Sequence, residues 1–591
     1  MSHNEVECLT HHAMLVVWGQ FAQSIGLVER IKSLSLHQKG VRHHPQTKIL
    51  EFFVAILAGL LHLKDLSRSA HPIDQDQAVA TAWAQTAWAD YSGVSRTLAA
   101  LTQEEAGQVA AVLDEITRPI LATEVIGALR HHGRLVYDGD LTDRPVSNSS
   151  TTYPDVAYGH LGDAVQLGYQ AAMVSMHSPT YGRFWLSVAS HPGDTVSCTQ
   201  AEAMILVAEA KTGFRPWRRT DLLSDRLRAV SEDLQTRQEQ LLATQQTMTV
   251  TETQEADTRE RIDSQRALVA QLEAEYREKQ RPERPYSALA KARHQLGVLE
   301  RRLSRLAKRL LELNQQLLVR QRLLDDCQAQ QQFLQRRREQ FEAENHSNRC
   351  PIEAVFRLDA GFGTRENVAL LIEMGYEVYI KPYSNWLLPR LKRWAQKQAA
   401  WTTVGQNAEM VAWQAVALPD FPYPLDVALQ RFHTGETQRH AALIHFGKDP
   451  VTTDLPGWFH HYNARQTIEA GIKEGKNVFE MHHLKVRSAF GLYLQEQFAV
   501  FAANFVRWAA HWLATQCPQL PASWQDAAQP KVKEMVKVAA HTSAWVSWQE
   551  QGCLLKFTDH SVFAGRPLQV ERRWVLQLPL PFSENALFAR L

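Results

Sequence analysis

The segment from Asp221 to Glu344 constrains the fold more than any other part of the chain, because nearly every residue in it favours a helix. It contains one glycine, Gly297, and its two prolines, Pro282 and Pro285, stand close together. Each proline removes a backbone donor and disfavours helix at the residue before it. We therefore expect two long helices, separated by the break QRPERPYS.

Both predicted helices carry apolar residues at alternating spacings of three and four, the a/d pattern of a heptad repeat. The clearer seam is Leu296, Leu299, Leu303, Leu306, Leu310, Leu313, Leu317, Leu324 and Cys327, and the weaker one is Leu227, Val230, Leu234, Leu241, Met248, Ile262, Val269 and Leu272. The pattern predicts an antiparallel coiled-coil hairpin whose arms are roughly 85 to 90 Å long at about 1.5 Å per residue. Because the ends of such a hairpin lie side by side, it can be inserted into a domain without separating the parts that flank it.

Composition narrows the class of protein. The chain has 591 residues, of which 45% are hydrophobic and 21% charged, as in globular proteins. The formal net charge is only +1, so any surface that binds a polyanion must be local. The six cysteines form no C-x-x-C pair, which argues against a disulfide framework and a cysteine zinc site.

The acidic start does not resemble a signal peptide, and the longest apolar run is too short to cross a membrane. We expect a cytoplasmic protein, associated with the nucleoid when bound to DNA, that does not enter a membrane.

Outside the hairpin, the order of predicted elements indicates an α/β core. Three strands (RLVYDGDLT, 169–177 and 182–191) precede the helix TQAEAMILVAEAKTG. The strand EAVFRL, the helix TRENVALLIEMG and the strand YEVYIKP follow the hairpin. The predicted divisions are an α-helical N-terminal domain that could bind DNA (1–130), the first part of the core (131–220), the hairpin (221–345), the second part of the core (346–385), a β-rich insertion (386–460), core helices (461–520) and a β-rich C-terminal region (521–591).

Two aspartates stand at the ends of predicted strands. Asp140 lies on the first strand, two residues after Asp138 and on the same strand face, and Asp359 follows the fourth strand. An aspartate before a glycine is usually only a turn residue. In a ribonuclease-H-like sheet, however, the first and fourth strands are neighbours, so these aspartates would converge and become candidate metal ligands. Either Asp138 or Asp140 can be the first ligand.

The segment YNARQTIEAGIKEGK fits the pattern Y-x2-R-x3-E-x6-K, with Tyr462, Arg465, Glu469 and Lys476 on one side of a helix. One carboxylate is thus surrounded by donors. The alternative is a solvent-exposed helix in which Arg465 and Glu469 form an ordinary ion pair.

A basic and aromatic stretch precedes this segment. Between residues 381 and 397 there are five basic and no acidic residues, interleaved with Trp386 and Trp394, which suits a nucleic-acid backbone and unstacked bases. The candidate DNA-binding residues are Lys381, Arg390, Lys392, Arg393 and Trp386. The alternative is a solvated helix face with two core tryptophans. The paired histidines, including His482 and His483, are interpreted as incidental.

These motifs together resemble the DDE transposases of bacterial insertion sequences, in the group called family four. The resemblance rests on VYDGDLTD, on RLDAGFGTRENVALLIEMGYEVYIKP and on the Y-x2-R-x3-E-x6-K signature, within residues 48–515 apart from the hairpin. It implies that Asp140, Asp359 and Glu469 bind two Mg²⁺ or Mn²⁺ ions. It also implies that Tyr462, Arg465 and Lys476 hold the phosphate at a transposon end.

The resemblance implies a function as well. We expect metal-dependent cleavage at transposon ends and strand transfer, acting on terminal inverted repeats and target DNA, with a homodimer in the DNA complex. The long hairpin is not part of the family pattern, so its role cannot be carried over. The alternative is a host-adopted descendant that binds DNA or a partner without transposing.

Overall fold

The computed structural model describes residues 7–38, 42–150, 152–383, 386–398, 400–434, 437–517, 520, 522–526, 531–558 and 566–574. The chain forms two compact units, Arg218–Ser347 and the remainder, Met1–Trp217 with Asn348–Leu591. None of the helices among the described residues is both long and apolar enough to span a bilayer.

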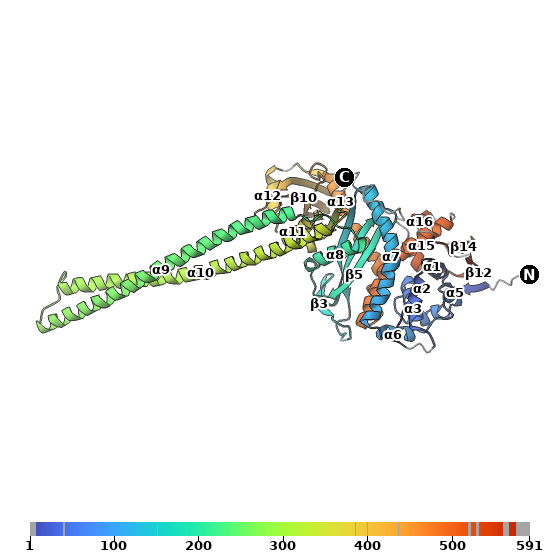
Figure 1. Cartoon of the computed structure of the whole chain (residues 1–591), viewed down its shortest axis with the longest axis horizontal. Helices are drawn as coiled ribbons and strands as arrows, with labels where there is room; N and C mark the ends of the chain where they lie inside the picture. Colours follow the sequence, from blue (N-terminus) through green and yellow to red (C-terminus); the bar gives the residue numbers. More distant parts are fainter. Residues whose placement is uncertain are drawn as a thin grey trace, which may run out of the picture. The chain divides into compact units, whose positions relative to one another are not determined.

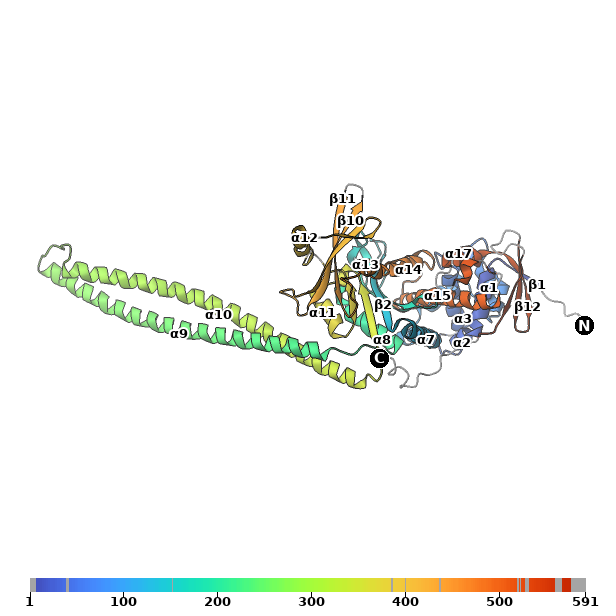
Figure 2. The ribbon, with the colours of Figure 1, turned by 90° about the horizontal axis from the view of Figure 1, so that it is seen from above.

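The smaller unit is a hairpin of two long helices, α9 (Thr220–Glu278) and α10 (Ala288–Ser347), seen side by side in Figures 1 and 2. Side-chain contacts show that the two helices run in opposite directions, because residues late in α10 contact residues early in α9. Gln331 donates to Ser231 at 3.0 Å, and Arg266 pairs with Glu300 at 2.9 Å nearer the turn. The predicted antiparallel helical hairpin is therefore confirmed.

The first arm fills part of its seam with threonines. Thr244, Thr251 and Thr258 are buried at heptad spacing, and each hydroxyl donates to the carbonyl four residues earlier. This local bond satisfies the hydroxyl, so a threonine can occupy a position that the pattern assigns to an apolar residue. A search of the sequence for apolar residues does not include these three threonines. The heptad pattern of the first arm is therefore weaker in the sequence than in the structure.

The larger unit is built on a ten-stranded mixed sheet. Its strands in sheet order are β3 (Ala157–Leu161), β4 (Ala164–Ser178), β2 (Arg134–Pro145), β6 (Glu353–Leu358), β7 (Glu377–Ile380), β11 (Thr437–Phe446), β10 (Leu425–Thr434), β9 (Ala408–Val416) and β8 (Thr402–Gly405), with β5 (Gly182–Pro192) paired to β4. Strands β2, β6 and β7 are parallel, and β4 is antiparallel to β2. The predicted mixed α/β class and the adjacency of the first and fourth strands are confirmed.

Helices cover this sheet, and two of them, α13 and α14, carry Tyr462 and Glu469 of the candidate site. They are α7 (Gln103–His132), α8 (Ala201–Thr212), α11 (Arg365–Glu373), α12 (Leu388–Gln398), α13 (Leu455–Asn463), α14 (Gln466–Asn477) and α15 (Ala489–Gln516), with short turns η2 (Ser197–Thr199) and η3 (Ala360–Phe362). Helix α15 is apolar on nearly all sides because it packs against β5, α7 and the N-terminal helices. Asn504 also fixes it to the sheet by two bonds with the backbone of Trp185, at 3.0 and 2.9 Å.

The N-terminal residues form a helical layer on α15. It comprises α1 (Ala13–Ser24), α2 (Leu27–Lys32), α3 (Pro45–Leu57), α4 (Asp65–Arg68), η1 (Ile73–Gln75), α5 (Gln77–Ala82) and α6 (Tyr91–Ala99). Phe53 of α3 contacts the rings of Phe498, Phe501 and Phe505 on α15, with centroids 5.1 to 5.6 Å apart. These helices therefore belong to the same compact unit as the sheet.

A second, four-stranded sheet joins distant parts of the sequence. Its order is β1 (Glu7–Thr10), β12 (Ala544–Gln549), β13 (Gly552–Phe557) and β14 (Leu568–Glu571), and α16 (Ala522–Gln525), α17 (Val532–Lys537) and η4 (Ala539–His541) precede it in the chain. Residues 575–591 of the predicted β-rich C-terminal region lie outside the described residues.

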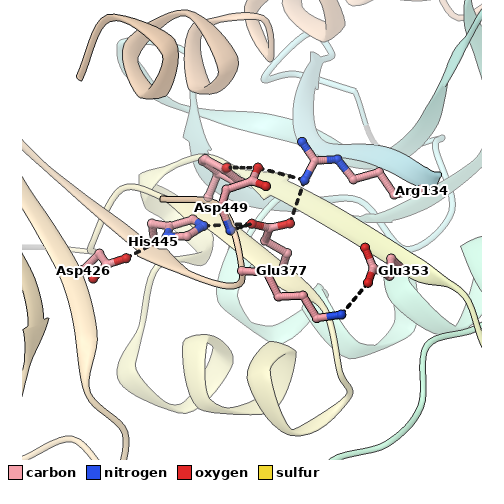
Figure 3. A network of polar contacts seen from close by, with 8 residues as sticks. Arg134, Glu353, Glu377, Asp426, His445 and Asp449 are labelled. Carbon is pink, nitrogen blue, oxygen red and sulfur yellow. Dashed lines mark hydrogen bonds and ion pairs between the residues drawn. The ribbon is translucent and has the colours of Figure 1, made fainter. Parts of the chain in front are cut away.

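Strands β8 to β11, predicted as a β-rich insertion, continue the main sheet through the antiparallel pairing of β11 with β7. A buried polar network crosses this junction (Figure 3). The His445 ring is fully buried and lies between Asp426 at 3.1 Å and Glu377 at 3.0 Å. Arg134, at the start of β2, pairs with Glu377 and Asp449, both at 2.8 Å. The network thus ties the inserted strands to the first strand of the core.

The surroundings of His445 favour its charged form. Burial alone would lower its pKa, but the hydrogen bonds and negative charges of Asp426 and Glu377 raise that pKa above its usual value. Because the folded pKa is raised, the stabilisation is complete below the unfolded pKa of about 6.5 and is lost as pH rises through the folded pKa.

We predict that His445→Leu lowers the free energy of unfolding by about 3 kcal/mol at pH 6, because the partly buried carboxylates of Asp426 and Glu377 lose the imidazolium between them and Glu377 keeps only Arg134. Urea denaturation of full-length protein measures this loss, and the difference from wild type should shrink at alkaline pH. His433→Leu is the matched control, since its half-exposed ring pairs with Glu409 and should contribute less than about 1 kcal/mol. A loss at His445 that is equally large at pH 6 and at alkaline pH would contradict the charge assignment.

Candidate active site

The candidate site lies where β2 and β6 run side by side. Asp138 is the last residue of β2 paired with β6, opposite Arg357. Asp140 lies two residues beyond Asp138, still paired with β4 through Met173, and Asp359 lies two residues beyond Arg357. Because the strands are parallel, Asp140 and Asp359 stand at equivalent levels at the carboxyl end of the central pair.

Asp359 begins a tight turn after β6. Its carboxylate accepts a hydrogen bond from the Gly361 amide at 2.9 Å, which caps η3. This is the turn role that an aspartate before a glycine usually plays. The same carboxylate also influences the charge state of Asp140, so the turn holds it close to the first strand.

Arg465 joins the first and third carboxylates. It immediately precedes α14, and its guanidinium lies 2.6 Å from Glu469 Oε1 and 3.5 Å from Asp140 Oδ2. The Arg465 side chain is only 10% exposed, whereas that of Glu469 is 44% exposed. Arg465 is therefore part of the site and not an arm of an ordinary solvent-exposed ion pair.

Tyr462 and Lys381 form the wall beside Arg465. The Tyr462 hydroxyl donates to the carbonyl of Leu358, the residue before Asp359, at 3.5 Å, and Lys381 Nζ lies 5.4 Å from the Tyr462 ring centroid. Burial lowers the pKa of Lys381, as does the charge of Arg465, while Glu469 and Asp359 act in the opposite direction. Lys381 therefore lies within electrostatic reach of two of the carboxylates.

Helix α14 can approach the sheet closely because residue 471 is a glycine. A Cβ at Gly471 would stand 2.4 Å from Arg183 Nη1 and 2.7 Å from the Trp185 ring, both on β5. A side chain at this position, two residues after Glu469, would therefore have to displace the Arg183 guanidinium and the Trp185 ring. Arg183 was not singled out from the sequence, because nothing in the pattern of β5 distinguishes an arginine that packs against a helix.

The electrostatics of the site centre on Asp140. Burial raises its pKa to about 7, the negative charges of Asp359 and Glu469 act in the same direction, and Arg465 and the Leu141 amide offset them in part. The three carboxylates thus act on one another in a partly buried setting, and an added cation would favour the charged form of Asp140.

The three carboxylates offer only oxygen ligands, which suit hard divalent ions. Within the described part of the chain they do not form a group whose ligand atoms all lie within 4.8 Å of one another. Two ions about 3.5 to 4 Å apart can be held by carboxylates that are more widely spaced than the ligands of one ion. Asp140, Asp359 and Glu469 fit such ions in chemical type.

Asp138, the alternative first aspartate, is engaged elsewhere. Both of its oxygens accept from Arg357, at 2.6 and 2.8 Å, and both side chains are 3% exposed. Arg357 also donates to the carbonyl of His461, next to Tyr462, at 3.0 Å. Asp138 therefore links the two strands to α13, and Asp140 is the aspartate that faces Arg465. Arg357 was not singled out from the sequence.

The other predicted DNA-binding residues lie apart from the carboxylates. Lys476 pairs with Asp143 at 2.8 Å. Trp386 stacks on Phe421 and lies under the guanidinium of Arg365. Helix α12 carries Arg390, Lys392 and Arg393, of which the last two are exposed. Of the basic and aromatic stretch, Lys381 is the residue that reaches the site.

Neither a protein-family model nor a curated protein matches this chain.

We predict opposite effects on stability for the two neighbouring aspartates in metal-free buffer. Asp138→Asn should lower the free energy of unfolding by about 3 kcal/mol, because Arg357 stays buried with a neutral partner. Asp140→Asn should raise it, by up to about 4 kcal/mol at pH 7, because the pKa of Asp140 in the folded protein is raised from 3.8 to about 7.

The sign follows from proton binding. Between pH 3.8 and about 7 the folded state binds more protons at Asp140 than the unfolded state, so stability falls as pH rises, and Asp140→Asn should flatten that slope. Urea denaturation with a chelator at several pH values measures both variants. An Asp140→Asn protein less stable than wild type would contradict this reading of the site.

Proposed function

We propose that the protein is a DDE transposase, which cleaves DNA at transposon ends and transfers the strands with Asp140, Asp359 and Glu469 as ligands of two Mg²⁺ or Mn²⁺ ions. The observation that carries the proposal is that one buried arginine, Arg465, pairs with Asp140 of β2 and Glu469 of α14, while Asp359 at the end of β6 lies near enough to act on the charge of Asp140.

The strand arrangement supports the same proposal. Strands β5, β4, β2, β6 and β7 are neighbours in that order, and only β4 of the other four runs antiparallel to β2. A ribonuclease-H-like core has its third, second, first, fourth and fifth strands in this order. We therefore propose that the sheet is such a core, extended by β8 to β11 and interrupted between β5 and β6 by the hairpin.

In the proposed reaction, bound divalent ions would activate the attacking oxygen and stabilise the leaving oxygen of the phosphodiester. The side chains of the chain itself position the DNA. Arg465 contacts two of the three ligands, so its guanidinium can hold a phosphate beside them. Lys381 and Tyr462 line the same wall of the site. Lys476 forms an ion pair with Asp143.

We predict that Asp359→Asn and Glu469→Gln each reduce Mg²⁺-dependent cleavage of DNA carrying the element's ends by at least about 100-fold. Binding of the ends should remain within about threefold, because affinity comes mainly from basic contacts to phosphate. Strand cleavage on gels and binding by gel shift measure the two effects. Glu366→Gln, an exposed carboxylate on α11, is the matched control and should cut normally. Wild-type cleavage by both site variants would refute the assignment.

We further propose that the hairpin serves the pairing of transposon ends and not catalysis. The chain on either side of it is tied within the larger unit, where Asn348 donates to the carbonyls of Arg215 and Pro216 at 3.1 and 3.3 Å. A short linker can therefore replace the hairpin without moving the strands that it connects.

We predict that replacing residues 225–340 with a short Gly/Ser linker gives a folded protein that binds a single DNA end with normal affinity but does not assemble paired ends. Gel shift and light scattering distinguish the two complexes. Paired-end complexes of wild-type stability would refute the pairing role, and an insoluble product would mean that the hairpin is required for the core to fold.

A further inference from the structure

A second group of possible metal ligands lies in the connection between α14 and α15. Glu480, His482 and His483 each present one ligand atom, and these atoms all lie within 4.8 Å of one another. Glu480 is buried and the two histidines are half-buried. The group consists of two imidazoles and one carboxylate, unlike the all-carboxylate set around Arg465.

The hydrogen bonds of the group leave donor atoms available to an ion. Glu480 Oε1 accepts from Lys537 at 2.6 Å, while Oε2 lies 3.7 Å from His483 Nε2. His482 Nδ1 is buried and has no hydrogen-bond partner among the described residues. A buried ring nitrogen without a partner is costly unless something else binds it.

The backbone of the connection is strained and tightly held. Glu480 has a φ of +52°, a conformation that residues other than glycine adopt rarely and that collects at functional sites. The Met481 carbonyl accepts from Arg144 at 3.1 Å, and the His483 carbonyl accepts from Gln495 at 2.8 Å. The three ligands are therefore positioned by the fold on both sides.

A cavity of about 500 Å³ gives an ion access to the group. His482 and His483 line it together with His62, whose ring centroid lies 6.4 Å from that of His483. The cavity leaves room for a water molecule, or for His62, as a fourth ligand.

We propose that Glu480, His482 and His483 form a binding site for a divalent transition-metal ion, with Zn²⁺ as the preferred occupant. Two histidines and one carboxylate are a ligand set that Zn²⁺ takes, whereas Mg²⁺ prefers oxygen ligands alone. The site is separate from the carboxylates assigned to DNA cleavage. It replaces the interpretation of His482 and His483 as incidental.

The surroundings of the site indicate a structural role. Lys537 of α17 donates both to Glu480 and to the carbonyl of Gly59, just after α3, at 2.7 Å. His62 belongs to the same N-terminal turn. An ion bound to Glu480 and the histidines would therefore fix the connection that follows the Glu469 helix, through which Glu480 also holds Lys537 of α17. With His62 as a fourth ligand, the ion would tie this connection to the N-terminal helical layer.

The test uses the full-length protein, freed of metal by a chelator and then titrated with Zn²⁺ by calorimetry. We expect one Zn²⁺ per chain, retained in the triple variant Asp140→Asn, Asp359→Asn, Glu469→Gln, which separates this site from the proposed catalytic one. His482→Ala with His483→Ala should weaken binding at least 100-fold. His131→Ala with His132→Ala, an exposed pair on α7, is the matched control and should bind as wild type does.

Two further measurements keep the result clear. Zn²⁺ should raise the melting temperature of wild type but not of the His482 and His483 variant, and Co²⁺ should give a visible spectrum of nitrogen and oxygen coordination that the variant lacks. If the double variant does not fold, His482→Gln alone carries the test. No Zn²⁺ binding by wild type, or unchanged binding by the histidine variants, overturns the proposal. Loss of binding in the triple carboxylate variant would assign the ion to the other site.

Discussion

The buried ion pair between Asp138 and Arg357 is the interaction on which the rest of the site depends. It links the two central parallel strands, which lie side by side in the sheet, and the third nitrogen of the guanidinium donates to the carbonyl of His461, beside Tyr462. Two residues beyond this pair on each strand stand Asp140 and Asp359. One guanidinium thus links both strands to the end of α13, and removing either partner would leave the other charge buried without its counterion.

Much of the architecture could be predicted from the sequence because periodicity and turn residues are local signals. The strands that became β2, β4, β5, β6 and β7, and the long helices α9 and α10, all follow from such signals. The convergence of Asp140 and Asp359 needed one further assumption, that the first and fourth strands are neighbours, and the pairing of β2 with β6 agrees with it.

What the sequence did not reveal depends on contacts between distant residues. Asp138 and Asp140 lie on the same face of their strand. In the structure they differ in that Asp138 is paired with Arg357. The buried threonines of α9 are polar by composition but satisfied by their own helix. Likewise, His482 and His483 look like any histidine pair until a strained turn brings Glu480 to them.

The pairing of β1 with β12 has a consequence for synthesis of the chain. Glu7 lies opposite Ser547, so β1 finds its partner only after the roughly 540 residues between them have been made. At about 5 to 20 residues per second, that wait is on the order of half a minute to two minutes. During that time β1 is an unpaired edge that could associate with other chains. The strand is only four residues long, which limits this risk.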